Sequence, residues 1–270
     1  EEARGLVDKD GIRLPDALRE VGIEFERAKD CGSEFKNAAA YLELHIEQGP
    51  VLEREAVDIG LVAAIAGISR FEIVVEGRAD HAGTAPMNLR ADALVAAAGI
   101  VLAVRRLAVA LCDRGRHFTA TVGEFEIEPG AANVVPSRVR LLVDARAEVR
   151  SDMDAFARGL EHAVAGAANA PDIVIAPPRR LSDNPPVRSD DALLRALDQA
   201  CARVGASRRP MVSGAGHDAA WIARRAPAAM VFVPSRGGRS HCPEEWTETS
   251  EIALGAAVLF EAVHALDKSI

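Results

Sequence analysis

Apolar residues alternate with polar ones, or form short unbroken runs, in several segments of the chain. An alternation with a period of two is typical of a strand that buries one face, and a short apolar run bounded by turns is typical of a fully buried strand. We therefore predict strands at residues 41–46, 59–65, 71–76, 118–127, 138–146, 173–175 and 228–233.

Other segments carry the period of a helix. Apolar residues recur at spacings of three and four from Asn88 to Leu111, which predicts a long amphipathic helix. Ser151, with Asp154 three residues later, resembles a capping box and predicts the start of a second helix there. Further helices are predicted after residue 191, after residue 217 and around residues 254–263.

The order of these elements predicts two domains of different kind. Between residues 71 and 176 it is β-α-β-β-α-β, the order of a ferredoxin-like α+β domain with four antiparallel strands and two helices on one face. The flanking segments are α/β. We therefore expect an α/β catalytic domain at residues 1–67 and 183–270, interrupted by an inserted domain at residues 68–182. Gly67 and the prolines at 177, 178, 185 and 186 mark the hinges.

Composition and charge narrow the class of partner. The chain has 270 residues, 49% of them hydrophobic and 27% charged, so it should fold. A net charge of -8 argues against a nucleic-acid partner, which usually requires a basic face. The apolar stretch from Ala91 to Leu111 is broken by Arg105 and Arg106, so we expect no membrane span. Small molecules and proteins are the expected partners.

The cysteines form neither a metal motif nor a disulfide framework. They are far apart and include no C-x-x-C pair. This spacing favours a reducing, cytoplasmic location. They are Cys31, Cys112, Cys201 and Cys242.

The segment from Glu43 to Pro50 is the first candidate for chemistry. Strand alternation places Glu43, His45 and Glu47 on one face. A neutral imidazole with carboxylate neighbours can bind zinc and be held in one tautomer. An exposed face of an edge strand explains the same pattern, and on these residues alone it is the preferred interpretation.

Three more candidates lie in the predicted inserted domain. His81, in a loop of small residues, can donate to a developing oxyanion, or it can simply stabilise the turn. Asn133 and Arg146 could together hold a carboxylate, because a guanidinium matches a carboxylate bidentately. The alternative for Arg146 is a solvated basic strand face.

Two loops of the α/β part complete the set of candidates. The loop from Ser213 to Asp218 contains Gly216 and His217 and opens a helix, so its amides could face a ligand. Its spacing fits neither a phosphate-binding loop nor a serine-hydrolase elbow. The other loop carries His241 and follows a buried strand, a common place for ligands in open α/β sheets.

Taken in order, these motifs resemble those of the zinc amidohydrolases that cleave N-carbamoyl amino acids, β-ureido acids and allantoate, within the M20 metallopeptidase group. The resemblance extends over nearly the whole chain. The motifs are Glu43–Pro50, Asp80–Met87, Asn133–Pro136, Asp144–Arg146, Ser213–Ala219 and Ser240–His241.

The resemblance implies a zinc-hydrolase-type catalytic domain, a homodimer formed through the inserted domain, and an active site with two zinc ions, or Mn, Co or Ni. His45 and His241 would be metal ligands, and His81 would polarise the scissile carbonyl at the partner subunit's metal centre. Arg146 would grip the substrate carboxylate. The residues implied to line the substrate site are Gln48, Asn133, Arg146, Gly216 and His217.

The implied reaction is hydrolysis of an N-carbamoyl-L-amino acid to the amino acid, carbon dioxide and ammonia, with allantoate hydrolysis as the alternative. The family's other metal ligands lie upstream, in a His-x-Asp motif, a bridging Asp and a Glu-Glu pair, and none is found in this chain. We therefore expect on the order of a hundred residues to be missing and the metal site to be incomplete. The alternative of another class is an inactive fragment or dimerisation module without zinc.

Overall fold

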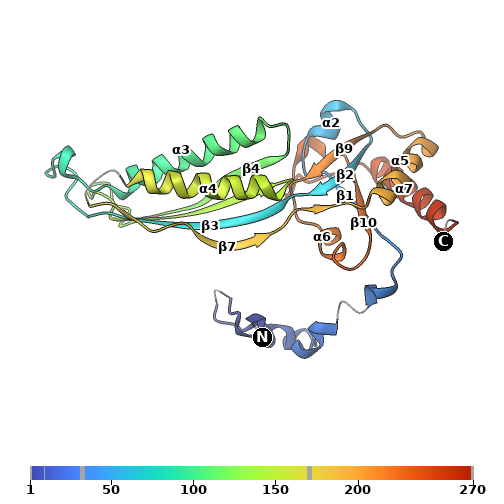
Figure 1. The fold of residues 1–270 in the computed structure, drawn as a ribbon, viewed down its shortest axis with the longest axis horizontal. Coiled ribbons are helices and arrows are strands. Elements are labelled where there is room, and N and C mark those ends of the chain that lie inside the picture. Colours follow the sequence, from blue (N-terminus) through green and yellow to red (C-terminus); the bar gives the residue numbers. More distant parts are fainter. Residues whose placement is uncertain (1, 9, 31–33, 169–171, 269–270) are drawn as a thin grey trace.

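Two β-sheets joined end to end form the body of the molecule in the computed structural model (Figure 1). The structure describes residues 2–8, 10–30, 34–168 and 172–268. Of the cysteines, Cys112, Cys201 and Cys242 are free thiols, and Cys31 lies outside the described residues.

The first sheet comes from both ends of the chain and has the strand order β1-β10-β2-β8, with β9 also paired to β2. Its strands are β1 (Tyr41–Ile46), β2 (Ile59–Ile65), β8 (Val187–Arg188), β9 (Arg208–Ser213) and β10 (Ala228–Val233). β1 and β10 are parallel, whereas β10 and β2 are antiparallel. The sheet is therefore mixed, as expected for an α/β unit.

Helices cover both faces of the first sheet. Along β10, Val231 and Val233 pack toward one layer of helices, while Met230 and Phe232 pack toward the other. Every residue of β10 is buried, which confirms the prediction of a fully buried strand. The layers are α5 (Asp191–Val204) with α7 (Thr249–Asp267), and α2 (Val51–Glu55) with α6 (Asp218–Ile222).

The second sheet is antiparallel, with the order β4-β5-β3-β6 and β7 also paired to β3. The first four strands and two helices have the predicted ferredoxin-like order, and both helices pack on the same face. The bounds assigned to the domains stay a prediction. The elements are β3 (Gly67–Glu76), α3 (Ala93–Cys112), β4 (Phe118–Glu128), β5 (Arg138–Ala147), α4 (Arg150–Ala167), β6 (Val174–Ile175) and β7 (Arg179–Asn184).

Two predicted helix starts are wrong. α3 begins at Ala93 rather than near Asn88, because the Asp92 side chain accepts hydrogen bonds from the amides of Leu94 and Val95 and so caps the helix. Residues 87–89 form a separate 3₁₀ turn. α4 begins without a side-chain cap, so the capping box predicted at Ser151 is not formed.

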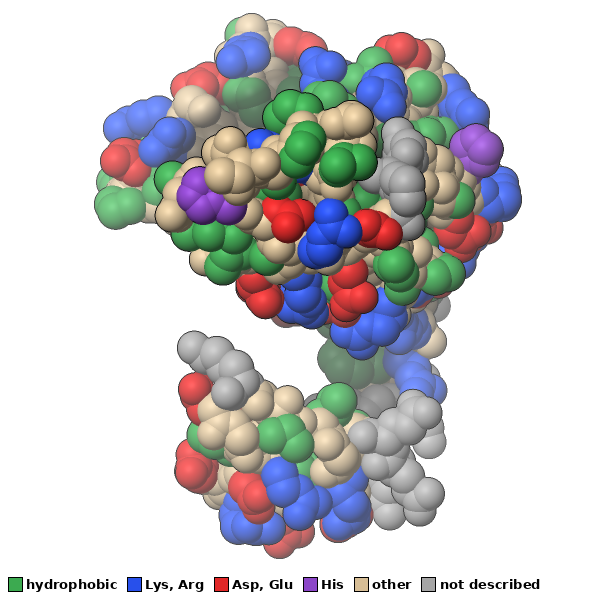
Figure 2. All heavy atoms as spheres, turned by 90° about the vertical axis from the view of Figure 1, so that its left-hand side faces the viewer, with side chains coloured by type: hydrophobic (Ala, Val, Ile, Leu, Met, Phe, Trp, Pro, Cys, Tyr) green, Lys and Arg blue, Asp and Glu red, His purple; other side chains and the backbone are tan. Residues whose placement is uncertain are grey.

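The segment before β1 stands apart from the sheets. Figures 1 and 2 both show it as a separate lobe, and its helix α1 (Leu14–Glu20) buries no residue. It packs against the short 3₁₀ helices of the same segment. These are η1 (Glu2–Gly5) and η2 (Phe25–Asp30), with η3 (Glu34–Asn37) nearer to β1.

By length and composition, α3 and α7 are apolar enough to cross a membrane. In the structure each packs one side against a sheet, through residues such as Ile100 of α3 and Val258 of α7. The expectation that the chain does not span a membrane stays a prediction.

Candidate active site

The carboxylates flanking His45 on β1 act as caps for two helices. Glu47 is buried, and its carboxylate accepts hydrogen bonds from the amides of Val51 and Leu52 at 2.8 Å each, in the first turn of α2. Glu43 accepts one at 2.8 Å from the amide of Ala219 in α6. Negative charge is favoured at helix N-termini. β1 does lie at the edge of its sheet, but this face is not exposed, so the preferred interpretation of an exposed face is wrong.

His45 and His217 are brought together although 172 positions separate them in the sequence. Their rings meet edge to face with centroids 4.6 Å apart. His45 lies on β1, and its Nδ1 is 2.7 Å from the carbonyl oxygen of Ile46. Since a carbonyl only accepts, this nitrogen carries the proton, and Nε2 keeps the lone pair that a metal ion requires.

His217 is buried and neutral. Burial lowers its pKa to about 4, and the charge of His45 acts in the same direction. Its Nε2 is 2.7 Å from the hydroxyl of Ser213, while Nδ1 is 3.7 Å from Glu43 and makes no hydrogen bond. At neutral pH the contact with Glu43 is therefore not an ion pair, and a buried imidazole nitrogen is available at the site.

Hydrogen bonds join the loop after β1 to the loop that carries His241. The amide of Gln48 donates to the Ser235 hydroxyl, and its side chain donates to Ser240, both at 3.0 Å. A side chain at Gly238 would come within 2.6 Å of the Pro50 nitrogen, so the crossing of the loops requires glycine there. Segments from opposite ends of the chain are thus held side by side.

Both predicted metal ligands lie near the carboxylate of Glu245. The pKa of Glu245 is lowered by a hydrogen bond from Ser240, by the amide of His241, and by the charges of the His241 and His45 imidazoles. The amide of His241 donates to Glu245 at 3.1 Å. The structure therefore places His45, His241 and Gln48 in one region.

Arg146 reaches this region from the second sheet. It pairs with Asp144 at 2.7 Å and donates to the carbonyl oxygen of Gly214 at 2.7 Å, in the loop that leads to His217. Arg140, on the same strand face, is instead saturated by ion pairs with carboxylates of neighbouring strands. Arg146 therefore differs from Arg140, because it contacts the loop of His217 and is not only part of a solvated basic strand face.

His117 is part of this junction, and no sequence motif pointed to it. Its Nε2 is buried without a hydrogen-bond partner, and a side chain at Gly214 would come within 3.0 Å of it. Burial lowers the pKa of His117; the charge of Glu148 opposes this shift and that of Arg146 adds to it. Phe118, the next residue, pairs across the sheet with Ala147, the neighbour of Arg146.

His81 and Asn133 lie at the other end of the second sheet. They are adjacent, since the amide of Ala82 donates to the carbonyl oxygen of Asn133 at 2.9 Å. The amide of Gly83 donates to Nδ1 of His81 at 3.0 Å, so His81 does stabilise its turn. The length of β5 separates Asn133 from Arg146. Within one chain, Asn133 and Arg146 therefore do not come together around a carboxylate. The functional roles predicted for His81, Asn133 and Arg146 stay predictions.

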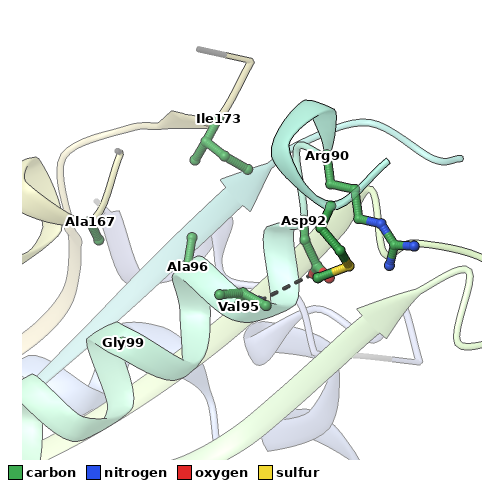
Figure 3. A pocket seen from close by; sticks show the side chains of 8 residues that line it. Arg90, Asp92, Val95, Ala96, Gly99, Ala167 and Ile173 are labelled. Atoms are coloured by element: carbon green, nitrogen blue, oxygen red, sulfur yellow. Dashed lines mark hydrogen bonds between the residues drawn. The ribbon is translucent and has the colours of Figure 1, made fainter. Parts of the chain in front are cut away.

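A pocket near that end of the second sheet is distinct from the histidine region. It has a volume of about 360 Å³ and lies at the start of α3, between Val95, Ala96 and Ile173 (Figure 3). Its walls are largely apolar, with Arg90 and Asp92 at one side. No histidine is among the described residues that line this pocket, so it is not part of the candidate active site.

His45 and His241 are the residues of this region that could hold a metal ion. His45 has a correctly oriented proton and lone pair, and His241 lies in the facing loop. Within residues 2–8, 10–30, 34–168 and 172–268, no group of three or more His, Cys, Asp or Glu side chains is placed to hold a metal ion. A metal centre built on these two imidazoles would need further ligands.

Comparison with known proteins agrees with this architecture. The N-carbamoyl-L-amino-acid amidohydrolase of Paenarthrobacter aurescens is 36% identical over 267 residues, which are 99% of this chain and 64% of that protein. The allantoate amidohydrolase of Bacillus subtilis is 35% identical and is covered to 63%. A hydantoinase/carbamoylase family amidase from Burkholderia multivorans superimposes with a TM-score of 0.83 at 35% identity, covering 97% of this chain and 62% of that one.

The fold is that of the amidohydrolases among these relatives. The chain belongs to peptidase family M20/M25/M40, whose model matches residues 11–265. This family generally uses divalent metal ions. The chain spans somewhat less than two thirds of the length of the relatives described above.

Proposed function

We propose that this chain provides the substrate-binding part of an amidohydrolase that converts an N-carbamoyl-L-amino acid to the amino acid, carbon dioxide and ammonia. The observation that carries the proposal is the convergence of Arg146, from the second sheet, on the loop that holds His217 against His45. A guanidinium beside these imidazoles suits an anionic substrate with a polar head.

Each residue of the site has a role in this proposal. The Arg146 guanidinium binds the amino-acid carboxylate, because its bonds to Asp144, from Nε and Nη2, and to Gly214, from Nη1, do not use all of its N–H groups. Gln48 and neutral His217 orient the carbamoyl group, and Gly216 lines the same site. His45 and His241 hold metal. When bound, a pair of divalent ions such as zinc lowers the pKa of a water molecule and polarises the carbonyl.

The proposal places His81 and Asn133 at the active site of a second copy. They lie too far from Arg146 in one chain, and the outer face of α3 offers an apolar surface on which two copies can associate. His81 suits a contact with a developing oxyanion, because Nδ1 accepts from Gly83 and Nε2 then carries the proton. We also propose a cytoplasmic location.

The test is ammonia release by the complete amidohydrolase that contains this chain, supplied with Zn²⁺, with N-carbamoyl-L-methionine and allantoate as substrates. We expect N-carbamoyl-L-methionine to be preferred. Arg146→Gln should lower its kcat/KM by about 10- to 100-fold, the loss typical of a hydrogen-bonded charge pair. Arg140→Gln, on the same strand face, is the matched control and should change it little. A preference for allantoate would favour the alternative substrate, since a relative bears that name.

A second candidate is of another class, namely a dimerisation module without zinc. It is favoured by the lack of a three-residue metal group among the described residues. Zinc analysis of the same samples separates the two candidates. Ammonia release with about two zinc ions per chain, the number in two-metal hydrolases, would exclude the module. No ammonia and no bound zinc would support it.

A further inference from the structure

A small pocket lies beside His217, where the two sheets join. Gly216 and His217 form one side of it, and Ile68, Pro185 and Trp221 contribute to the others. Its volume is about 50 Å³. We call it the hinge pocket, because both chain segments that connect the sheets line it.

The register of the second sheet sets the hinge pocket next to Arg146. Ile68 pairs with Arg146 on one side and with Asn184 on the other. Residues directly opposite in an antiparallel sheet point to the same face, with Cβ atoms about 5 Å apart. Arg146, Ile68 and Asn184 thus form a row across the sheet. Arg146 contacts Gly214, whereas Ile68 and Asn184 line the hinge pocket together with Gly216.

This arrangement matches the shape of an amino acid. The carboxylate and the side chain leave the same carbon atom, so a molecule whose carboxylate is bound by Arg146 places its side chain within a few ångström, over Ile68. The lining of the hinge pocket is mainly apolar and also includes Ile65 and Val187. Among the described residues of the lining, Arg224 is the one that is permanently charged, and it packs over the Trp221 ring, 4.5 Å from its centroid; the others are uncharged or, like His217, neutral.

The volume limits what can enter. A cavity of about 150 Å³ holds a benzene molecule, so 50 Å³ holds only a few carbon atoms. Ile68 forms the side toward the second sheet, and Trp221, which is 56% exposed, forms part of the mouth.

We propose that the hinge pocket binds the side chain of the substrate's amino-acid part and selects small aliphatic side chains, with Ile68 and Trp221 as the specificity-determining residues. This inference rests on the proposed function, because it takes Arg146 as the carboxylate anchor. It adds the substrate class: N-carbamoyl-L-amino acids with side chains about the size of that of valine.

The experiment is a binding titration followed by isothermal titration calorimetry. The probes are the N-carbamoyl derivatives of glycine, L-valine and L-tryptophan, with Zn²⁺ present. We expect the valine derivative to bind about 10-fold more tightly than the glycine derivative, as one or two buried carbon atoms provide, and the tryptophan derivative to bind more weakly than valine.

Variants of β3 separate the hinge pocket from the carboxylate anchor. Ile68→Phe should fill the hinge pocket, so that the valine derivative loses its 10-fold advantage while the glycine derivative binds as before. Ile68→Ala should improve binding of the tryptophan derivative. Val74→Phe, on the same face of β3 but six residues toward the far end, should change none of the three affinities.

Two results would overturn the inference, and they are distinguishable. If all three probes bind equally well, or if Ile68→Phe weakens them equally, the side chain binds elsewhere while the proposed function stands. If no probe binds at any concentration tested, the proposed function fails, and this inference fails with it.

Discussion

His117 lies against the backbone of Gly214, at the junction of the two sheets. His117 and Arg146 both hold the loop that carries His217. His117 packs against Gly214, and Arg146 donates a hydrogen bond to the carbonyl oxygen of Gly214. The buried Nε2 makes no hydrogen bond, so the protonated ring would carry an unpaired charge beside the Arg146 guanidinium. Glu148 is the acidic group that opposes this effect.

This environment predicts a loss of stability in mild acid. Because the pKa of His117 is lowered in the folded state, the unfolded chain binds more protons as the pH falls below about 6.5, the ordinary histidine pKa. The free energy of unfolding should then decrease toward pH 5. His117→Gln should reduce that slope, by at most about 1.4 kcal/mol per pH unit.

Urea unfolding at pH 7, 6 and 5 measures the effect. His162→Gln, at an exposed histidine of α4, is the control and should keep the slope of the unsubstituted chain. An unchanged slope in His117→Gln would show that His117 does not titrate in this way.

The sequence identified the residue types of the site better than their contacts. Alternation correctly placed Glu43 and Glu47 on the face of His45. The capping role of Glu47 had a local signal, since the amides it binds lie four and five positions later, after a Gly-Pro turn. The partner of Glu43, Ala219, lies 176 positions away, and no local pattern reports such a contact.

At the scale of elements, the two helices of the second sheet differ at their starts. α3 is capped by Asp92, whereas α4 lacks a side-chain cap although Ser151 and Asp154 resemble a capping box. In α4 those residues lie inside the helix, and Arg150 pairs with both Asp154 and Asp183 of β7. The start of α4 is therefore set by contacts with a distant strand.

This difference predicts that alanine at Asp92 costs more stability than alanine at Ser151. Asp92→Ala should lower the free energy of unfolding by about 1 kcal/mol, the usual cost of a lost N-cap. Ser151→Ala should change it by less than about 0.5 kcal/mol, as for an exposed position. Thermal unfolding followed by circular dichroism compares the two variants. Equal losses would mean that Ser151 caps α4 after all.

β7 shows why some elements could not be predicted. Its sequence, Arg-Arg-Leu-Ser-Asp-Asn between two pairs of prolines, has no apolar alternation and suggested only a hinge. The strand is held by long-range polar contacts, among them Arg179 with Glu72 and Ser69 with Asp183. Hydrophobic periodicity reports burial, and β7 is mostly exposed.

For the whole molecule, α3 leaves an apolar stripe uncovered. Val95, Leu102 and Val109 recur every seven residues, so they lie on one side of the helix, and they are 69%, 58% and 46% exposed. β4 lies at the edge of the adjacent sheet, with β5 as its neighbour. A helix stripe beside an open strand edge suits association of two copies across a twofold axis.

We accordingly expect a dimer whose mass, by light scattering after size-exclusion chromatography, is twice that of the chain. Leu102→Glu should yield monomers at micromolar concentration, because it places a charge in an apolar contact of both copies. Phe260→Glu is the control, since Phe260 is equally apolar, 69% exposed, and lies on α7 of the other half. A monomeric unsubstituted chain, or a dimer that tolerates Leu102→Glu, would contradict the prediction.

The overall organisation was largely accessible from sequence because it depends on periodicity. The core strands, the order of the second sheet and the family motifs all follow from patterns along the chain. What could not be predicted is distance in space. Asn133 and Arg146 lie 13 positions apart, yet an entire strand places them at opposite ends of a sheet.

The chain crosses between the sheets twice at neighbouring points, through Gly67 and through Pro186. A side chain at Gly67 would come within 2.6 Å of the Pro186 nitrogen, so the crossings form one narrow ribbon. A bend at these crossings would rotate the second sheet relative to the first. Arg146 and Ile68 lie close to the rotation axis and would hardly move. The loop of His81 lies roughly 30 Å farther along β3, so a rotation of about 10° would move it by about 5 Å. The proposed carboxylate anchor would therefore stay in place during such a motion, while the loop of His81 would make nearly all of the movement.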